Sequence, residues 1–254
     1  MKIFTVLGTG WLGLELAKKL KSSYKIKVSI RDEEKLKLYE NEGFSSYVLN
    51  ENNYSFLDEL LDTSYLFVNF PPSKSNDYLG FLNKIYNHEK IKNIKKIIFI
   101  SSTSVYPSSE GFYNEDFEIK DPSSKIVYEA EKLVESKTDV IFRASGLVGA
   151  NRIPGRRLSA KYIECPKTKM NFVHRNDVIN ASKYVIENNI SGIFNLCSKQ
   201  HPTKEELYSF NSIKYGFELP IFSDNTEHTN RLIDGSKISK LGFEYKYTDA
   251  FNFE

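Results

Sequence analysis

Three glycines near the N-terminus have the spacing of a loop that binds a pyrophosphate. Gly8, Gly10 and Gly13 form the pattern G-x-G-x-x-G between a short apolar run and a helical pattern. In such a loop the first glycine permits a tight turn, the second lets the backbone approach the pyrophosphate, and the third lets helix and strand pack closely. The helix N-terminus offers N–H groups and a partial positive charge to the phosphates. The pattern predicts a dinucleotide site made by the three glycines with Trp11 and Leu12, against the alternative of a glycine turn without a ligand.

The residue after the second predicted strand indicates which dinucleotide binds. An NAD site places a carboxylate there to bind the ribose hydroxyls. This sequence instead has Arg31, followed by Asp32. A guanidinium group pairs with a 2′-phosphate through two parallel hydrogen bonds. We therefore predict NADP as the cofactor, with NAD as the alternative; in that case Arg31 is only solvated and Asp32 caps its helix.

Hydroxyl groups follow the buried strand that the sequence predicts over residues 96–100. Ser101 and Ser102 begin the segment SSTSVY. Hydroxyls at the carboxyl end of a central strand lie where ligands bind in open α/β sheets. Asn69 and Phe70 end the preceding predicted strand, and we expect them to line the same cleft unless they form a plain turn. Ser101, Asn69 and Phe70 are thus predicted to bind the cofactor.

A tyrosine and a lysine further along the chain have the spacing of an acid/base pair. Tyr128 and Lys132 are four residues apart, so on a helix they share a face. An ammonium group beside a phenol stabilises the ionised phenol, which an acid/base catalyst needs. The chain has 16 tyrosines, so this spacing also arises by chance on an exposed helix face.

Alternating strand and helix patterns must position these side chains. Strands are expected over residues 2–7, 24–30, 47–49, 65–70, 96–100 and 140–142, and helices over residues 11–21, 32–42, 55–61, 78–93 and 125–136. Such alternation predicts an α/β fold, a Rossmann doubly wound parallel sheet with helices on both faces. We assign residues 1–150 to a dinucleotide-binding domain. Residues 151–254 form a smaller C-terminal substrate-binding lobe that packs on it and is not independent.

Several motifs together resemble one enzyme family over nearly the whole chain. They are the glycine motif, SSTSVY, YEAEK from Tyr128 onward, and IDGSKISKLGF near the C-terminus. They resemble the extended short-chain dehydrogenases/reductases of the NAD-dependent epimerase/dehydratase family, and look closest to the YeeZ-like branch. The resemblance implies an NAD(P)-dependent oxidoreductase or epimerase acting on a small carbonyl, alcohol or sugar. It also implies that Ser102 orients the substrate, Tyr128 is the general acid/base and Lys132 holds the nicotinamide ribose.

One departure from the family pattern leaves the catalytic set open. Members usually carry a proline about four residues before the tyrosine, whereas Pro122 lies six residues before Tyr128. A second alignment places Ser123 at the tyrosine position and Val127 at the lysine position. The alternatives are then a non-catalytic NADP-binding or sensor protein, or a nucleotide-sugar epimerase/dehydratase. Against the latter, the region after Gly149 is short.

Composition gives no reason to propose other kinds of partner. The 254 residues carry a formal net charge of +2 without a polybasic block, so we expect no nucleic-acid partner. No apolar run approaches the roughly 20 residues of a membrane span, so we expect no membrane partner. Two cysteines and four scattered histidines lack metal-ligand spacing, so we expect no metal. A cytoplasmic protein with a small-molecule substrate, either a monomer or a homodimer, is expected.

Overall fold

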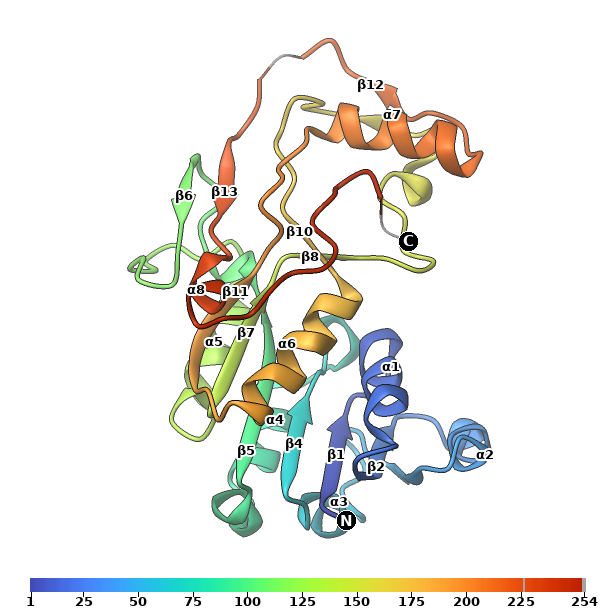
Figure 1. Ribbon diagram of the computed structural model, residues 1–254, viewed down its shortest axis with the longest axis vertical. Coiled ribbons are helices and arrows are strands. Elements are labelled where there is room, and N and C mark those ends of the chain that lie inside the picture. Colours follow the sequence, from blue (N-terminus) through green and yellow to red (C-terminus); the bar gives the residue numbers. More distant parts are fainter. Residues whose placement is uncertain (226, 253–254) are drawn as a thin grey trace. The chain divides into compact units, whose positions relative to one another are not determined.

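The computed structural model describes residues 1–225 and 227–252, which form two compact units (Figure 1). Unit 1 comprises Met1–Ser101, Ser124–Phe142 and Ser182–Ile193. Unit 2 comprises Ser102–Ser123, Arg143–Ala181 and Phe194–Glu254. Each unit is thus built from three separate stretches of chain. The assignment of cofactor binding to residues 1–150 and substrate binding to residues 151–254 stays a prediction.

A seven-stranded sheet carries the fold. Its strands are β1 (Ile3–Leu7), β2 (Lys25–Ile30), β3 (Ser45–Val48), β4 (Tyr65–Val68), β5 (Lys96–Ser102), β7 (Val140–Ala144) and β11 (Gly192–Leu196). Their order is β11-β7-β5-β4-β1-β2-β3, and β1 to β5 pair in parallel. The chain changes direction between β1 and β4, which makes their carboxyl ends the switch point where ligands bind in such sheets. The predicted α/β class and doubly wound parallel sheet are confirmed.

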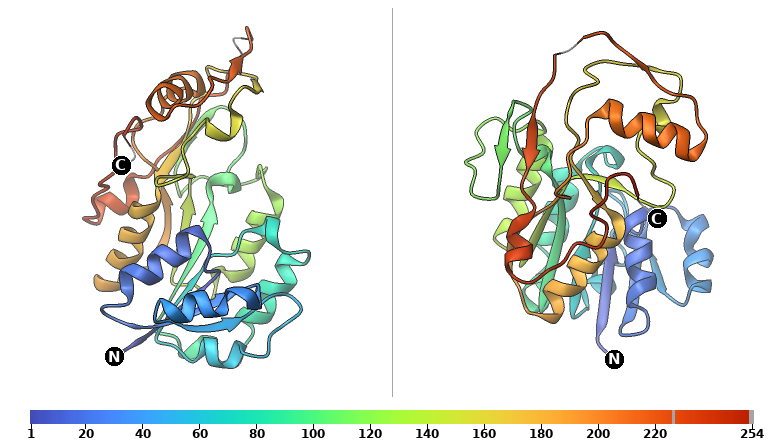
Figure 2. Two further views of the ribbon diagram at one scale, coloured as in Figure 1. Left: turned by 90° about the vertical axis from the view of Figure 1, so that its right-hand side faces the viewer. Right: turned by 45° about the horizontal axis from the view of Figure 1, so that its top comes forward.

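Helices cover both faces of the sheet in unit 1. They are α1 (Trp11–Leu20), α2 (Leu36–Asn41), α3 (Leu57–Leu61), α4 (Tyr78–Tyr86) and α5 (Lys125–Glu135), and α6 (Arg175–Glu187) begins in unit 2 and ends in unit 1. Helix α1 lies on one face, and α4 and α5 lie on the other (Figure 2). One apolar cluster joins α3, α4 and α5 to β4 and β5. The central strands are buried on both sides, and their apolar runs match that environment.

Unit 2 consists of short elements around two helices, α7 (Lys204–Tyr215) and α8 (Ser236–Lys240). Its strands pair in parallel as β8 (Gly146–Val148) with β10 (Phe172–His174), β9 (Tyr162–Ile163) with β12 (Ile221–Phe222), and β6 (Gly111–Tyr113) with β13 (Arg231–Ile233). The start of α7 is a capping box, because the Glu206 amide donates to Thr203 Oγ1 and the Thr203 amide donates to the Glu206 carboxylate.

The structure also contains short 3₁₀ turns, two of which interrupt expected helices. The turns are η1 (Glu33–Lys35), η2 (Pro72–Lys74), η3 (Glu89–Asn93), η4 (Thr103–Val105) and η5 (Arg156–Leu158), and those within expected helices are η1 and η3. The helix expected over 32–42 begins as η1 and continues as α2. The helix expected over 78–93 ends at Tyr86, since His88 adopts an extended backbone and its side chain accepts from the Lys90 amide at the start of η3.

Over the described residues, no helix combines the length and the apolarity that crossing a membrane requires.

Candidate dinucleotide-binding site

The glycine loop between β1 and α1 has the geometry that its sequence predicts. Gly8 has a φ of +88°, and a Cβ there would lie 2.3 Å from the carbonyl oxygen of Asn69. A Cβ on Gly13 would lie 2.5 Å from the carbonyl oxygen of Gly8, so α1 packs directly against the loop. At Gly10, by contrast, a Cβ would meet no heavy atom within 4 Å. The second glycine thus faces open space, and the approach of a pyrophosphate to its backbone stays a prediction.

The N-terminus of α1 suits an anion. Gly10 is its N-cap residue and supplies no side-chain capping hydrogen bond, and the first turn contains no acidic residue. Trp11 and Leu12 follow in that turn, where backbone N–H groups point out of the helix. The helix dipole adds a partial positive charge at this end. The residues present therefore fit the phosphates of a dinucleotide.

Strand β2 and helix α2 hold the loop in place through residues that sequence reasoning missed. The Gly8 amide donates to Ser29 Oγ at 2.9 Å, and the Thr9 amide donates to the Ser29 carbonyl at 3.2 Å. The Tyr39 hydroxyl donates to the Thr9 carbonyl at 2.9 Å. Ser29 is buried in the structure. In the sequence, the signal for it is a serine between two apolar residues, Val28 and Ile30, at the end of a predicted strand.

The end of β4 lies against the glycine loop. The Asn69 amide donates to the Leu7 carbonyl at 2.9 Å, and Asn69 Nδ2 lies 3.4 Å from the Gly8 carbonyl. Phe70 is buried, and its ring centroid lies 4.8 Å from that of Phe81 in the α4 layer. The structure thus brings Asn69 and Phe70 to the loop, with Phe70 turned into the core. Their contact with a cofactor stays a prediction.

Arg31 and Asp32 each have an ionic partner within unit 1. Arg31 Nη2 lies 2.6 Å from Glu51 Oε2. Asp32 is the N-cap residue of η1, but its side chain makes no capping hydrogen bond. It pairs instead with Lys35 at 2.8 Å, whose hydrogen bond and charge hold the pKa of Asp32 below its usual value. Asp32 therefore does not cap its helix as that alternative predicted, whereas Arg31 is partly exposed beside Glu51, and the choice between NADP and NAD stays a prediction.

Glu131, rather than Tyr128 or Lys132, is the polar side chain by which α5 contacts β5. Ser101 Oγ donates to Glu131 Oε2 at 2.6 Å, and only 1% of Glu131 is exposed. Ala130, Glu131 and Val134 form the buried side of α5. Successive helix residues are rotated by about 100°. Val127 lies about one helical turn before Glu131, so both residues share the face toward β5. Tyr128 and Lys132 each follow one of these two residues, so their face is rotated by about 100° from it.

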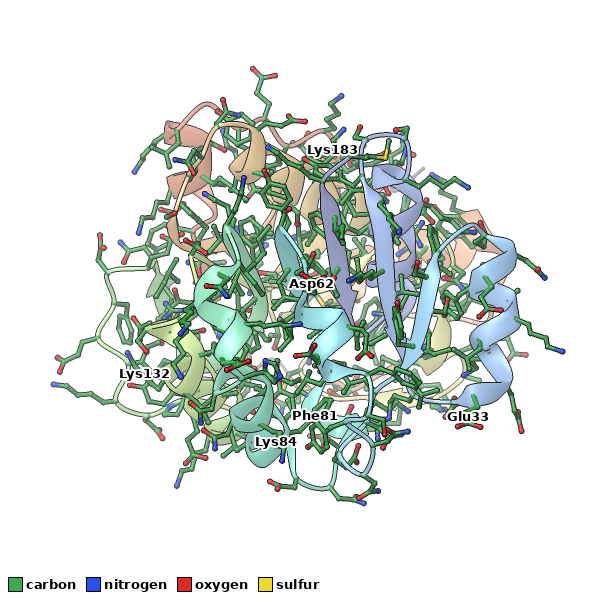
Figure 3. The ribbon with its side chains drawn as sticks, turned by 90° about the horizontal axis from the view of Figure 1, so that it is seen from below. Glu33, Asp62, Phe81, Lys84, Lys132 and Lys183 are labelled. Carbon is green, nitrogen blue, oxygen red and sulfur yellow. The ribbon has the colours of Figure 1, made fainter. Side chains whose placement is uncertain are left out.

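Tyr128 and Lys132 share a helix face, as their spacing predicts. Lys132 Nζ lies 5.7 Å from the centroid of the Tyr128 ring. Its ion pair is with Glu135 at 2.9 Å, and that hydrogen bond raises the pKa of Lys132. Figure 3 shows Lys132 pointing away from the sheet. Ser102 belongs to unit 2, where its Oγ accepts from the Ser104 amide, so the assembly of Ser102, Tyr128 and Lys132 stays a prediction.

In unit 2, the tyrosine of SSTSVY anchors its segment in a buried network. Arg143 Nη1 donates to the Tyr106 hydroxyl at 2.9 Å, and that hydroxyl lies 2.8 Å from Asn195 Oδ1. Arg231 donates to the Thr103 carbonyl. Burial raises the pKa of Tyr106 above its ordinary value. The network consists of residues far apart in the sequence, which gave no sign of it.

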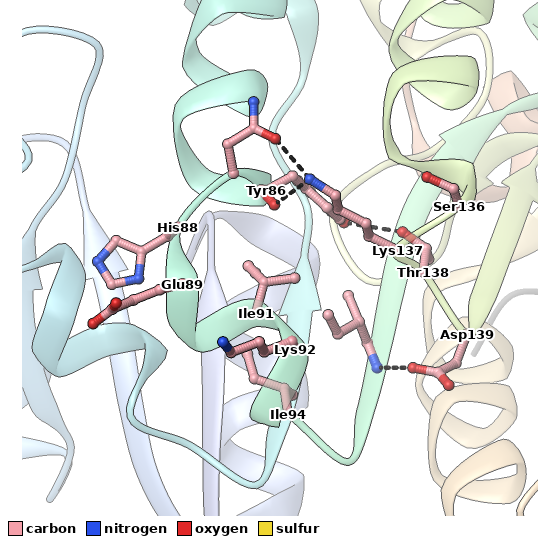
Figure 4. Close-up of a pocket in the computed structure, with 12 residues that line it drawn as sticks. Tyr86, His88, Glu89, Ile91, Lys92, Ile94, Ser136, Lys137, Thr138 and Asp139 are labelled. Atoms are coloured by element: carbon pink, nitrogen blue, oxygen red, sulfur yellow. Dashed lines mark hydrogen bonds between the residues drawn. The ribbon is translucent and has the colours of Figure 1, made fainter.

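A cavity of about 530 Å³ lies at the opposite edge of the sheet, by the amino ends of β5 and β7 (Figure 4). Lys137 Nζ donates to the Tyr86 carbonyl at 3.1 Å and to Asn87 Oδ1 at 2.6 Å. Asp139 Oδ2 accepts from the Ile97 amide at 2.7 Å. These side chains fasten loops together, and none of the predicted site residues lines this cavity.

Metal-binding side chains are not gathered anywhere in residues 1–225 and 227–252, where no group of three or more His, Cys, Asp or Glu side chains is placed to hold an ion. Cys165 and Cys197 are free thiols, and burial raises the pKa of Cys197 to about 12.

Comparisons with known proteins find one family of sequence relatives and several solved structures of similar fold. No family model matches the chain. Protein YeeZ of Escherichia coli strain K12 is 30% identical, over 98% of this chain and 97% of that protein. UDP-glucuronic acid 4-epimerase from Bacillus cereus, solved in complex with NAD, has a TM-score of 0.79 at 18% identity, covering 99% and 94% of the two chains. A conserved protein of unknown function from Silicibacter pomeroyi has a TM-score of 0.78 at 16% identity, covering 99% and 96%. At these identities the solved structures show a shared fold.

Proposed function

The chain belongs to the YeeZ family, within the extended short-chain dehydrogenases/reductases, and we propose that it is an NAD(P)-dependent oxidoreductase or epimerase of a small carbonyl, alcohol or sugar. The observation that carries the proposal is the glycine loop. Gly8 and Gly13 are packed so closely that no side chain fits, whereas the space at Gly10 is open. The backbone N–H groups beside Gly10 lie at the N-terminus of α1, whose first turn has no acidic residue, and such an end suits a phosphate.

The site residues would hold the cofactor in distinct ways. Backbone N–H groups at Gly10, Trp11 and Leu12 would bind the pyrophosphate, and Asn69 would border the cleft. Arg31 follows β2, where the adenosine ribose binds in this fold. When bound, the nicotinamide exchanges a hydride with the substrate carbon. Ser101 is still proposed to bind the cofactor. Because its hydroxyl donates to Glu131, it can offer a ligand only the lone pairs of its oxygen as acceptors.

Acid/base catalysis is proposed for Tyr128, with Ser102 orienting the substrate and Lys132 holding the nicotinamide ribose. One observation favours a second candidate, a dinucleotide-binding protein without this catalytic set. Lys132 is paired with Glu135 on the exposed side of α5, whereas Val127 and Glu131 share the face toward β5. That orientation supports the alignment in which Ser123 and Val127 occupy the catalytic positions.

A nucleotide-sugar epimerase is the remaining alternative. The Bacillus cereus structure is of a UDP-glucuronic acid 4-epimerase with NAD bound, and its likeness to this chain is one of fold. Only the shared fold supports that substrate class for this chain.

Calorimetric titration of NADP and NAD into the wild type and Gly10→Val tests the proposal. We expect the variant to lose dinucleotide binding, because the valine side chain occupies the space that the pyrophosphate needs. Its fold should be nearly unaffected, since Gly10 has a φ of −89° and no atom within 4 Å of the new Cβ. Unchanged affinity in a folded Gly10→Val variant would show that the motif is only a turn.

Gly13→Ala serves as the contrasting variant. Its Cβ would meet the Gly8 carbonyl at 2.5 Å, so stability and binding should fall together. A loss of binding with full stability is expected for Gly10→Val only, and thermal unfolding of both variants separates the two effects.

A further inference from the structure

The ends of β2 and β3 are joined by a charged pair that the dinucleotide motif does not explain. Arg31 follows β2 and Glu51 lies three residues beyond the end of β3. The two strands pair with Ile30 opposite Val48, and the Leu49 amide donates to the Ile30 carbonyl at 2.9 Å. This register places the side chains of Arg31 and Glu51 together, with 2.6 Å between Nη2 and Oε2.

Glu51 is the more firmly held partner. Its side chain is 10% exposed, against 36% for Arg31. Its Oε1 accepts from the Asn76 amide at 3.3 Å, so the carboxylate also ties in the segment before α4. Hydrogen bonds from its own backbone amide and from that of Asn76, with the charge of Arg31, hold the pKa of Glu51 below its usual value. Glu51 is therefore a fixed negative charge.

Two ion pairs lie at the end of β2, next to the predicted ribose site. Arg31 is compensated by Glu51, and Lys35 is compensated by Asp32 at 2.8 Å. A 2′-phosphate carries close to two negative charges, and a neutral pair attracts it far less than a lone guanidinium does. One Nη2 contact still leaves other N–H donors of the guanidinium available, so hydrogen bonding alone would remain.

We propose that Glu51 is a specificity-determining residue: by neutralising Arg31 beside the adenosine ribose, it keeps discrimination between NADP and NAD small. The inference rests on the proposed function, because it requires a dinucleotide in the glycine loop. It also revises the prediction of NADP that Arg31 by itself supports. The sequence position after β2 is basic, but the tertiary structure supplies a carboxylate from the segment after β3.

Paired affinities for NADP and NAD test the inference in wild type, Glu51→Gln and Glu51→Ala. Glutamine keeps one oxygen that can accept from Arg31, and it removes the charge and the second acceptor, which the Asn76 amide uses in the wild type. We expect the wild type to discriminate by less than about tenfold, and Glu51→Gln to bind NADP about tenfold more tightly with NAD nearly unchanged. Glu51→Ala should show the same direction with a smaller gain, because Arg31 is then no longer held. The double variant Arg31→Ala/Glu51→Gln should lose the gain.

Glu42→Gln is the matched control. Glu42 pairs with Lys18 at 2.8 Å in the same unit, so this variant makes the same charge change at another ion pair. Its NADP-to-NAD ratio should equal that of the wild type. Circular dichroism melts show that each variant is folded before its affinities are compared.

Two results would overturn the inference and leave the proposed function standing. One is a wild-type preference for NADP above about tenfold. The other is dinucleotide binding by Glu51→Gln with an unchanged NADP-to-NAD ratio. A wild type that binds neither NADP nor NAD would overturn the proposed function, and this inference with it.

Discussion

Tyr128 presents its ring to Lys132 across one turn of α5, but the ammonium group is engaged by Glu135. Replacement of Tyr128 by phenylalanine removes the hydroxyl and keeps the ring contact. If Tyr128 is the acid/base, Tyr128→Phe should leave dinucleotide affinity nearly intact and lower hydride transfer by roughly 10²–10⁴-fold. Rates of NADPH and NADH oxidation with a panel of carbonyl compounds measure this.

The same panel distinguishes the two alignments of α5. Lys132→Met is the companion variant, since a lysine that holds the nicotinamide ribose should weaken cofactor binding when it is replaced. Full activity and full affinity in both variants would show that Tyr128 and Lys132 only form an exposed face of α5. That result would favour the alignment in which Ser123 and Val127 occupy the catalytic positions.

At the scale of elements, one buried hydrogen bond joins α5 to the end of β5. Ser101 Oγ donates to Glu131 Oε2 at 2.6 Å, and both residues are buried. Ser101→Ala removes a donor from a buried carboxylate, and a hydrogen bond to a charged group contributes about 1.5–3 kcal/mol. We expect the free energy of unfolding to fall by about that amount, as measured by urea denaturation.

Ser22→Ala is the control for this prediction. Ser22 is exposed in unit 1, so its replacement should change the free energy of unfolding by less than about 0.5 kcal/mol. Equal stabilities of Ser101→Ala and Ser22→Ala would mean that apolar packing of Ala130 and Val134, and not the hydrogen bond, orients α5.

At the scale of the whole molecule, the chain passes between the units five times, so neither unit is one continuous segment. A chain truncated to residues 1–150 lacks Ser182–Ile193, which belongs to unit 1. Those residues supply the Val185 and Ile190 carbonyls that accept from the buried Lys96 ammonium at 3.4 and 2.8 Å. The truncated chain also loses β11, the edge strand beside β7, and the end of α6, so apolar surface that these elements cover becomes exposed to water.

We therefore expect the 1–150 fragment not to fold stably, in spite of its complete glycine loop. Urea denaturation followed by circular dichroism measures this against the full chain. Cooperative unfolding of the fragment, together with retained dinucleotide affinity, would contradict the expectation and show that the predicted domain boundary cuts between independent parts.

The sequence by itself determined the features that depend on neighbours along the chain. The glycine spacing predicted the tight turn at Gly8 and the close packing at Gly13, because each follows from a missing Cβ within one loop. Alternating apolar runs predicted the parallel sheet, because strands buried on both faces must be apolar throughout. Both predictions rest on local geometry, and both agree with the structure.

Only the tertiary structure decided which partner each polar side chain meets. Arg31 pairs with Glu51, twenty residues away, and Glu131 with Ser101, thirty residues away. Those pairs depend on the register of β3 beside β2 and on the rotation of α5 about its axis, which many distant packing contacts set together. Charge and spacing in the sequence therefore identified Arg31 and Tyr128 as candidates. The side chains that surround each of them could be found only from the folded structure.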